Sequence, residues 1–352
     1  MPNLKFISWN LKNVSRNKLQ KQFTAGFQAL GMGNTVMDYI VNVVLGTEVW
    51  EDVISPKPAD MFVIIELKTG GRRKGAPVSG SCIPSLTLVR NALNAAIPTN
   101  GYDPMEYQYD FLVPLVAGRY ETMGFLYNTR VFRPDPTPGA VSVVAERDQV
   151  TNTYLDGRTP LVAQLQFVQN PAVTMRWSAI HDRPPQGAAN IRFRPPISFC
   201  RRLPNTPSAA VTNTFFLGDF NCQPTNYYVN GAGNNVYPFG TAANLFANLP
   251  NYGTTLPDNS LTSVRKSLVN PPPDPTDPKS AYLSSPYDNS IYWAQNLLGG
   301  VETEVPDLIG EAKDHTFNPP IPLYPGRGRI VLNAYNRVSD HMPVITEFNI
   351  QV

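Results

Sequence analysis

The chain has 352 residues, 42% of them hydrophobic, and a formal net charge of +2. The hydrophobic share excludes an intrinsically disordered chain, and the near-neutral charge excludes a protein that binds nucleic acid through its overall charge. Any basic surface must therefore be local, and the length allows one large α/β domain or two ordinary ones.

The cysteines and the terminal sequence limit the cellular context. Three cysteines, Cys82, Cys200 and Cys222, are too few for a disulfide framework and show no CxxC metal spacing. No window of about 18 apolar residues is present, so we expect no membrane span. The N-terminal stretch does not resemble a signal peptide. We expect a soluble protein that is cytoplasmic or exported by a route without such a peptide.

The predicted elements mix strands and helices along the chain. A strand over residues 4–10 precedes two helices within about 17–50, which the "GMGN" stretch separates. A second strand covers 61–68, and a helix over 83–96 has Pro84 near its start, where a helix accepts proline. The remaining apolar runs predict strands over 109–116, 122–128, 140–146, 161–168, 173–181, 212–221, 289–296, 328–335 and 343–351.

This order of elements predicts sheets that are covered on at least one face, because helices lie between strands and several strands are apolar throughout. Prolines number 35 and cluster between the apolar runs, which predicts long, stiff surface loops. No linker divides the chain. We therefore expect a single domain over residues 1–352, with loop insertions near 20–57, 184–210 and 251–287.

Polar side chains stand at the ends of many predicted strands. Six segments contain them, and the residues are Asn10, Glu66, His181, Asp219, Asn221, Asp288, Asp340 and His341. A fold that gathers those strand ends on one side would create an acidic pocket lined by oxygen atoms. Such a pocket suits Mg²⁺ or Mn²⁺, because both ions prefer carboxylate, amide and water oxygens.

The stretch "FFLGDFNCQP" places Asp219 and Asn221 two residues apart where a buried strand ends. Side chains alternate along a strand, so this spacing can direct both oxygens into one pocket. Taken alone, the same residues also suit a turn, and "SDH" at 339–341 suits an ordinary strand entry. The presence of all six segments in this order favours a functional site over separate turns. Two of the three histidines, His181 and His341, belong to these segments.

In this order the segments resemble the motifs of the endonuclease/exonuclease/phosphatase superfamily, the deoxyribonuclease-I-like fold. The matching stretches run through almost the whole chain and read "ISWNLKN", "FVIIELK", "GRYETMGFLYN", "SAIHDRPP", "LGDFNCQP", "SPYDNSIYW" and "SDHMPVITEF". The "GDFN" and "SDHMPV" stretches are the most specific. The third stretch adds Glu121 at its acidic position.

The resemblance implies an α/β fold, a four-layer α/β/β/α sandwich in which two mixed β-sheets pack face to face with helices outside. It also implies metal-dependent cleavage of a P–O bond by an activated water. Asn10, Glu66 and Asp340 would surround the metal, which would be Mg²⁺ or Mn²⁺. A divalent cation suits this chemistry because it neutralises phosphate charge and lowers the pKa of a bound water.

The resemblance also assigns the residues that would carry the reaction, which are Asp219, Asn221, His181, His341, Glu121 and Asp288. The first two would orient the attacking water and the phosphate. The two imidazoles would contact phosphate oxygens or move protons, since imidazole titrates near neutral pH. Glu121 would orient His181, and Asp288 would orient His341, because a neighbouring carboxylate favours the imidazolium and fixes its orientation.

Basic residues near the expected site indicate a polyanionic substrate. Lys68 stands where nucleases of the deoxyribonuclease-I type carry an arginine that contacts phosphate, and Ile65 stands where many relatives carry glutamine. Arg72 and Arg73 lie in the basic run 70–75, and a second basic run covers 190–202. These side chains are candidates for contacts to substrate phosphate. The alternative is ordinary solvated surface, since Lys and Arg are mostly exposed.

The favoured function is a metal-dependent phosphodiesterase that acts on DNA as an endonuclease. The "YDNSI" stretch is nearer to the deoxyribonuclease-I-type form than to the Trp-Cys-Asp-Arg run of inositol-polyphosphate phosphatases. A sphingomyelinase-like or inositol-phosphate phosphatase, acting on a phospholipid or another phosphoester, is the alternative. A third hypothesis is a non-catalytic binding module on the same scaffold, but no core catalytic position is lost.

Overall fold

The structure is a computed structural model. It describes residues 3–28, 33–47, 56–69, 80–113, 121–136, 141–143, 161–181, 213–221, 228–229, 235–236, 253–254, 260–267, 269, 272–285, 287–294, 296–309 and 327–352. The loop over 184–210 and the arginines Arg72 and Arg73 lie outside these residues, as do parts of the loops over 20–57 and 251–287. The predictions made for those positions stay predictions.

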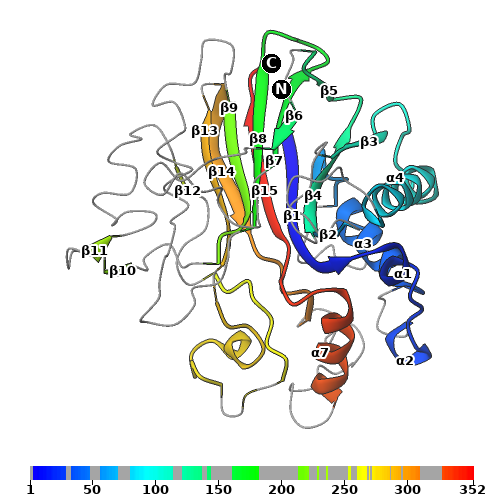
Figure 1. The fold of residues 1–352 in the computed structure, drawn as a ribbon, viewed down its shortest axis with the longest axis vertical. Helices are drawn as coiled ribbons and strands as arrows, with labels where there is room; N and C mark the ends of the chain where they lie inside the picture. Colours follow the sequence, from blue (N-terminus) through cyan, green and yellow to red (C-terminus); the bar gives the residue numbers. More distant parts are fainter. Residues whose placement is uncertain are drawn as a thin grey trace.

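Two mixed β-sheets form the centre of the molecule (Figure 1). The strands of sheet one are, in spatial order, β14 (Leu297–Glu304), β15 (Val344–Ile350), β1 (Asn3–Val14), β2 (Met61–Lys68), β4 (Glu121–Asn128) and β3 (Tyr109–Leu112). Only β1 and β2 pair in parallel, and the other neighbours are antiparallel. The sheet is therefore mixed, as predicted.

Sheet two has the same mixed character. Its strands are, in spatial order, β12 (Gly253–Thr254), β13 (Asp288–Ala294), β9 (Asn213–Asp219), β8 (Thr174–His181), β7 (Leu161–Phe167) and β5 (Phe132–Pro134), and β6 (Val141–Val143) also pairs with β7. Here β8 and β9 are the parallel pair. A separate two-stranded ribbon consists of β10 (Tyr228–Val229) and β11 (Asn235–Val236).

The two sheets pack face to face over an apolar layer to which both contribute every second residue. Phe6 of sheet one meets the edge of Trp177 from sheet two, with ring centroids 4.3 Å apart, and Trp177 stacks on Phe215 at 4.9 Å. Offset and edge-to-face contacts of this kind add to the free energy gained by burying the rings. This layer fixes how the strand ends of one sheet meet those of the other.

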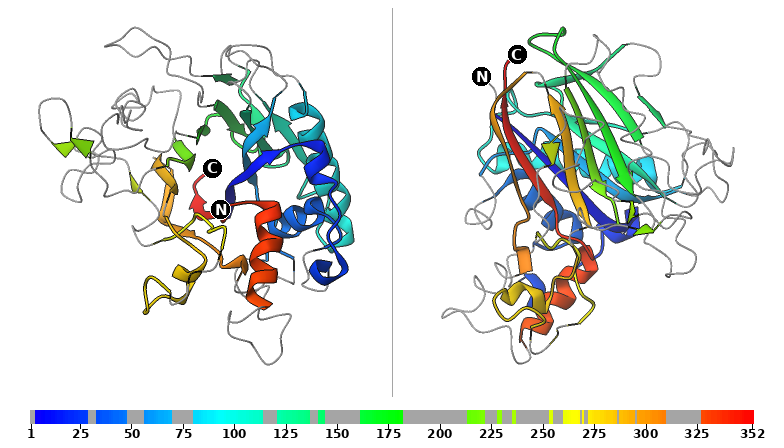
Figure 2. Two further views of the ribbon diagram at one scale, coloured as in Figure 1. Left: turned by 60° about the horizontal axis from the view of Figure 1, so that its bottom comes forward. Right: turned by 90° about the vertical axis from the view of Figure 1, so that its left-hand side faces the viewer.

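Helices cover the other face of sheet one (Figure 2). They are α1 (Arg16–Leu19), α3 (Val36–Leu45), α4 (Cys82–Thr99) and α7 (Arg327–Val338), with a 3₁₀ turn, η2 (Pro278–Ala281), near the last. The short helix α2 (Ala25–Gln28) contributes no described residue to this core. Helix α3 begins with a capping box between Thr35 and Asp38 and ends at Gly46, which has a φ of 61°. Helix α4 packs so closely on β4 that a Cβ at Gly124 would lie 2.9 Å from Leu67 and Leu86.

The predicted α/β sandwich with two mixed sheets is confirmed. Within the described residues the helical layer lies on sheet one, and no described helix covers the outer face of sheet two. None of the described helices is long and apolar enough to cross a membrane.

One predicted strand is wrong, because residues 328–335 belong to helix α7. The run is short and rich in branched side chains, which suggests a strand. Its buried side chains, Val331, Leu332, Tyr335 and Val338, have instead the spacing of one helix face. The spacing extends past the end of the predicted strand, and only the longer window identifies the helix.

Candidate active site

Three of the predicted site residues form one row across sheet two. Asp219, the last residue of β9, is the register partner of His181 on β8 and of Asp288 on β13. On each strand every second side chain faces sheet one, for example Trp177 on β8 and Leu217 on β9, and the three polar residues continue these rows. The row therefore lies where the apolar layer between the sheets ends.

Sheet one contributes two residues by the same alternation. Phe6 faces sheet two, and Asn10 lies four residues further along the same face of β1. On β4, Phe125 faces sheet two, and Glu121 lies four residues before it on the same face. Both polar side chains thus reach the same end of the sandwich as the row on sheet two.

Glu66 does not follow this alternation. On β2, Ile65 faces sheet two and Ile64 faces the helices, so a regular strand would turn Glu66 toward the helices. The backbone is instead left-handed at Glu66, with a φ of 63°, and the pairing of β2 with β4 shifts register between Ile64 and Leu67. This bulge turns the carboxylate to Asn10, whose Nδ2 donates to Oε1 at 3.2 Å.

Positive φ angles concentrate at this end of the sandwich. Among the described residues, the non-glycine residues with positive φ are Lys12, Asn13, Glu66 and Asn221. Such backbone costs on the order of 1–3 kcal/mol per residue and persists where the surrounding structure enforces it. All four lie next to or within the site, so the strain coincides with the polar cluster.

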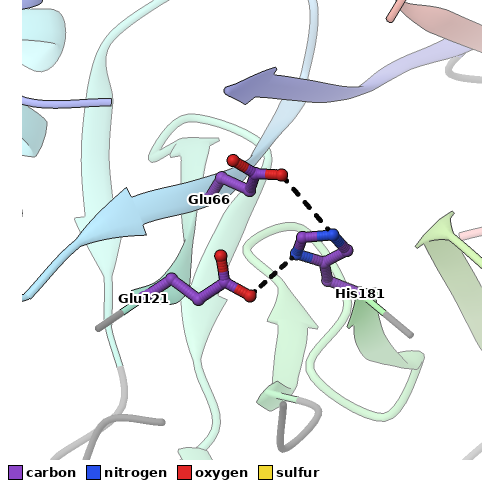
Figure 3. Close-up of side chains that lie close together, drawn as sticks. All are labelled: Glu66, Glu121 and His181. Carbon is purple, nitrogen blue, oxygen red and sulfur yellow. Dashed lines mark ion pairs between the residues drawn. The ribbon is translucent and has the colours of Figure 1, made fainter. Parts of the chain in front are cut away.

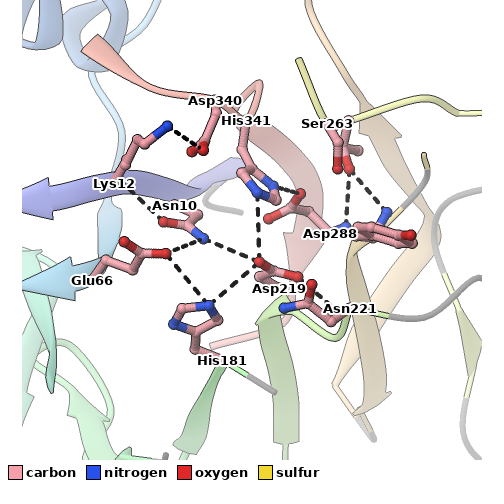
Figure 4. Close-up of polar contacts among 12 residues, drawn as sticks. Asn10, Lys12, Glu66, His181, Asp219, Asn221, Ser263, Asp288, Asp340 and His341 are labelled. Atoms are coloured by element: carbon pink, nitrogen blue, oxygen red, sulfur yellow. Dashed lines mark hydrogen bonds and ion pairs between the residues drawn. The ribbon is translucent and has the colours of Figure 1, made fainter. Parts of the chain in front are cut away.

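Asp219 is the centre of the cluster (Figure 4). Its Oδ1 accepts a hydrogen bond from the backbone N–H of Asn221 at 2.8 Å. Its Oδ2 accepts from Nδ2 of Asn10 at 3.1 Å and lies 3.6 Å from Nε2 of both His181 and His341. Three side chains that are distant in sequence, Asn10, His181 and His341, therefore meet at one oxygen of Asp219.

Each imidazole has Asp219 near its Nε2 and a second carboxylate near its Nδ1. Nδ1 of His181 lies 3.1 Å from Oε1 of Glu121, and its Nε2 lies 3.5 Å from Oε1 of Glu66 (Figure 3). Nδ1 of His341 lies 2.6 Å from Oδ2 of Asp288. The sequence-based pairing of Glu121 with His181 and of Asp288 with His341 agrees with this geometry, and it directs both Nε2 atoms toward Asp219.

Burial and neighbouring charge shift two pKa values in the cluster. Burial alone would lower the pKa of His341, but the carboxylates of Asp288, Asp219 and Asp340 outweigh it and raise that pKa to about 10. Burial raises the pKa of Asp219, although the two imidazoles oppose the shift. At neutral pH His341 is therefore an imidazolium, which is a proton donor aimed at the centre of the site.

Residues that the sequence analysis did not single out hold the backbone of His341. Its N–H donates to the hydroxyl of Ser339 at 2.9 Å, and that hydroxyl donates to the carbonyl of Asn10. Its carbonyl accepts from Nε1 of Trp9 and from the hydroxyl of Tyr335, both at 2.8 Å. These bonds tie the C-terminal motif to the end of β1.

Thr262 holds the backbone of Asp288, the carboxylate partner of His341. The sequence analysis did not single out this threonine. Its Oγ1 accepts from the backbone N–H groups of Tyr287 and Asp288, each at 3.0 Å, and its carbonyl accepts from Met342 at 2.7 Å. One buried threonine therefore links the segment of Asp288 to that of His341. No sequence motif marks it, because the contact depends on a loop far from both.

Three other predicted positions differ in how they relate to the cluster. Asn221 is buried beside Asp219 in the turn after β9 (Figure 4). Asp340 is adjacent to His341, but its Oδ2 pairs with Nζ of Lys12 at 2.6 Å. Lys68 is exposed at the end of β2, in register with Glu121.

The donor atoms of the site suit a divalent cation. Glu66, Glu121 and His181 each offer a ligand atom within 4.8 Å of the others, and Asp219, Asp288 and His341 do the same. Four carboxylates thus share a largely buried volume with two imidazoles, which leaves an excess of negative charge. Oxygen-rich, anionic surroundings are those that Mg²⁺ and Mn²⁺ prefer.

The fold and site define an α/β sandwich with an acid–imidazole site where the ends of its two sheets meet. No protein-family model matches the sequence, and no curated protein matches it. The chain is similar to D. rerio TDP2 complexed with single-strand DNA product, with 14% identity, a TM-score of 0.47, and coverage of 99% of this chain and 100% of that chain.

Two further solved structures are similar over comparable lengths. The human Nocturnin catalytic domain with bound sulfate has 11% identity and a TM-score of 0.48, covering 99% of this chain and 94% of that chain. The endonuclease/exonuclease/phosphatase from Bacteroides vulgatus has 11% identity and a TM-score of 0.48, covering 100% of both chains.

Proposed function

We propose that the protein is a divalent-metal-dependent hydrolase of phosphoester bonds, and that it cleaves DNA as an endonuclease. The supporting observation is the convergence of Asn10, His181 and His341 on one oxygen of Asp219, with Glu66 beside them. A phosphodiester is anionic, so a site must neutralise its charge before water attacks. Imidazolium donors and a cation-binding carboxylate cluster meet that need together.

Asn10 and Glu66 are the metal ligands with the strongest geometric support. Asp340 completes the set that the motif resemblance implies. The Asn10 amide directs Nδ2 at Glu66 and Asp219, and its Oδ1, which accepts from the N–H of Lys12, is the oxygen that a cation could bind. When bound, the cation supplies a Lewis acid for a phosphoryl oxygen and lowers the pKa of a water.

His341 and His181 would act on the phosphate through their Nε2 atoms. His341 is protonated at neutral pH, since its pKa is raised to about 10, so Nε2 can donate to a phosphate oxygen. Asp288 holds Nδ1 at 2.6 Å and thereby sets the direction of that donor. Oε1 of Glu121 lies 3.1 Å from Nδ1 of His181 and would orient that imidazole.

Asp219 would orient the attacking water and accept its proton. Asn221 occupies Oδ1 through a 2.8 Å hydrogen bond, which leaves Oδ2 directed at the centre of the site. Burial raises the pKa of Asp219, and a carboxylate with a raised pKa is a better proton acceptor. An orienting carboxylate of this kind contributes typically about 10²–10⁴-fold to rate.

DNA is the favoured substrate because basic residues lie close in sequence to strands that end at the site. Lys68 is exposed beside Glu121 in register. The basic runs at 70–75, with Arg72 and Arg73, and at 190–202 flank strands that end at the site. Cationic loops around a phosphate-cleaving centre suit a polyanionic backbone.

A substrate panel tests the proposal. The purified protein is incubated with supercoiled plasmid, with sphingomyelin vesicles and with an inositol polyphosphate, each in Mg²⁺ and again in excess EDTA. We expect conversion of the plasmid to the nicked form in Mg²⁺ only. Hydrolysis of the lipid or the inositol phosphate without nicking would refute the endonuclease and retain the hydrolase. Failure to hydrolyse any substrate would favour the non-catalytic module.

A further inference from the structure

Asp340 is predicted to bind the metal, yet its carboxylate already has a cation. Nζ of Lys12 lies 2.6 Å from Oδ2 of Asp340, and both side chains are only partly exposed. Figure 4 shows Asp340 directed at Lys12, on the far side of Asn10 from Asp219. By contrast, the carboxylate of Glu66 turns to Asn10 and His181.

The backbone around Lys12 is held in place, so its ammonium does not reach Asp340 by chance. The N–H of Lys12 donates to Oδ1 of Asn10 at 3.2 Å, and the next N–H, of Asn13, donates to Oε2 of Glu66 at 3.0 Å. The carbonyl of Lys12 accepts from Nζ of Lys18 at 2.6 Å. Three bonds fix a segment whose φ angles, 45° at Lys12 and 57° at Asn13, depart from a regular strand.

The position of Lys12 on β1 explains why it faces this site. It lies two residues beyond Asn10, in the segment between Asn10 and Val14 where the pairing of β1 with β2 shifts register. Lys18, at the start of the helical segment after β1, adds a second ammonium close by, since it also bonds to the carbonyl of Leu11. Two ammonium groups therefore lie on the Asp340 side of the cluster.

We propose that the ammonium of Lys12 is the resident cation of Asp340, so that the site binds one divalent ion, at Glu66 and Asn10, and Asp340 is not its ligand. This inference rests on the proposed function. A carboxylate that is paired with an ammonium at 2.6 Å has lost most of its attraction for a second cation. A divalent ion at Asp340 would also be repelled by Lys12 at short range.

Counting bound Mn²⁺ tests this inference without measuring activity. Free Mn²⁺ is followed by electron paramagnetic resonance at low salt for the wild type, Asp340→Asn, Lys12→Met and the double variant. Lys21→Met is the matched control, because Lys21 is exposed and its substitution removes the same charge elsewhere. Thermal unfolding of each variant confirms that it is folded.

The wild type should bind one Mn²⁺ per chain, and Asp340→Asn should leave the Kd nearly unchanged. Lys12→Met should expose Asp340 and either add a second ion or tighten binding about tenfold, and the double variant should return to one ion at the original Kd. Lys21→Met should behave as the wild type.

Two results would overturn the inference while the proposed function stands. One is a loss of Mn²⁺ affinity of about tenfold or more in Asp340→Asn, since that is the usual effect of removing a ligand or its support. The other is Lys12→Met binding Mn²⁺ as Lys21→Met does. A wild type that binds no Mn²⁺ would overturn both the inference and the metal dependence of the proposed function.

Discussion

At the scale of single residues, the site uses one arrangement twice. Each imidazole places Nδ1 on a carboxylate and directs Nε2 at Oδ2 of Asp219, at 3.6 Å in both cases. The two pairs differ in burial, since Asp288 is almost fully buried whereas the side chain of Glu121 is 23% exposed. Against the effect of burial, the carboxylate of Asp288, 2.6 Å from Nδ1, helps to raise the pKa of His341 to about 10.

The raised pKa of His341 predicts how stability depends on pH. A histidine whose pKa rises from 6.5 unfolded to about 10 folded stabilises the protein fully below pH 6.5 and loses that contribution as pH rises through about 10. The difference in unfolding free energy between wild type and His341→Gln should therefore narrow from pH 6.5 to 10. Urea denaturation at a series of pH values measures it, and a constant difference across this range would contradict the assignment.

The left-handed backbone of Glu66 predicts an unusual order among its variants. Glu66→Ala keeps the strained φ of 63° without the carboxylate, whereas glycine adopts that angle without strain. Glu66→Gly should therefore be more stable than Glu66→Ala by about 1 kcal/mol, although glycine in strands is ordinarily the less stable residue. Urea denaturation of both proteins decides, and equal stabilities would show that the bulge relaxes once the carboxylate is gone.

At the scale of elements, alternation along strands explains most of the site and bulges explain the rest. Asn10, Glu121, His181, Asp219 and Asp288 each continue a row of residues that faces the opposite sheet. This part of the site could be predicted from sequence, because the polar ends follow apolar strands of regular period. The strands themselves were largely predictable for the same reason.

Other features could not be read from the same pattern. Alternation alone would place Glu66 on the helix side, whereas its carboxylate accepts a hydrogen bond from Asn10; only the resemblance of its motif implies that the two residues share a site. Strand β14 went unpredicted because Gly299 and Gly300 interrupt an edge strand with little burial. The sequence of helix α7 predicts a strand because its apolar run is short and its side chains are branched.

The hydrogen bonds of Thr262 predict that this loop residue supports the pair of Asp288 and His341. Thr262→Val keeps the shape but leaves the N–H groups of Tyr287 and Asp288 without their acceptor, at a cost of about 1–3 kcal/mol per buried group. The kcat of Thr262→Val should fall more than its KM rises, because the direction in which His341 donates to the phosphate changes while the other substrate contacts do not. Thr262→Ser retains the acceptor and should recover both stability and kcat, so a serine variant as impaired as the valine variant would contradict this role.

At the scale of the whole molecule, the apolar layer between the sheets sets the position of the site. Phe6, Trp177 and Phe215 lock the two sheets together, and the polar rows begin where that layer ends. Residues from nearly the whole length of the chain therefore converge at this end of the sandwich. The backbone bonds of Ser339 and Trp9 then attach the C-terminal motif to the same end.

The initial rate of plasmid nicking, compared between wild type and Asp219→Asn in Mg²⁺, tests the central claim most directly. Glu106→Gln is the control, because Glu106 is exposed next to Asn128, at the end of β4 away from Glu121. We predict that EDTA abolishes nicking, that Asp219→Asn slows it about 10²-fold or more, and that Glu106→Gln leaves it unchanged. Nicking that persists in EDTA, or an Asp219→Asn protein as fast as the wild type, would contradict the account.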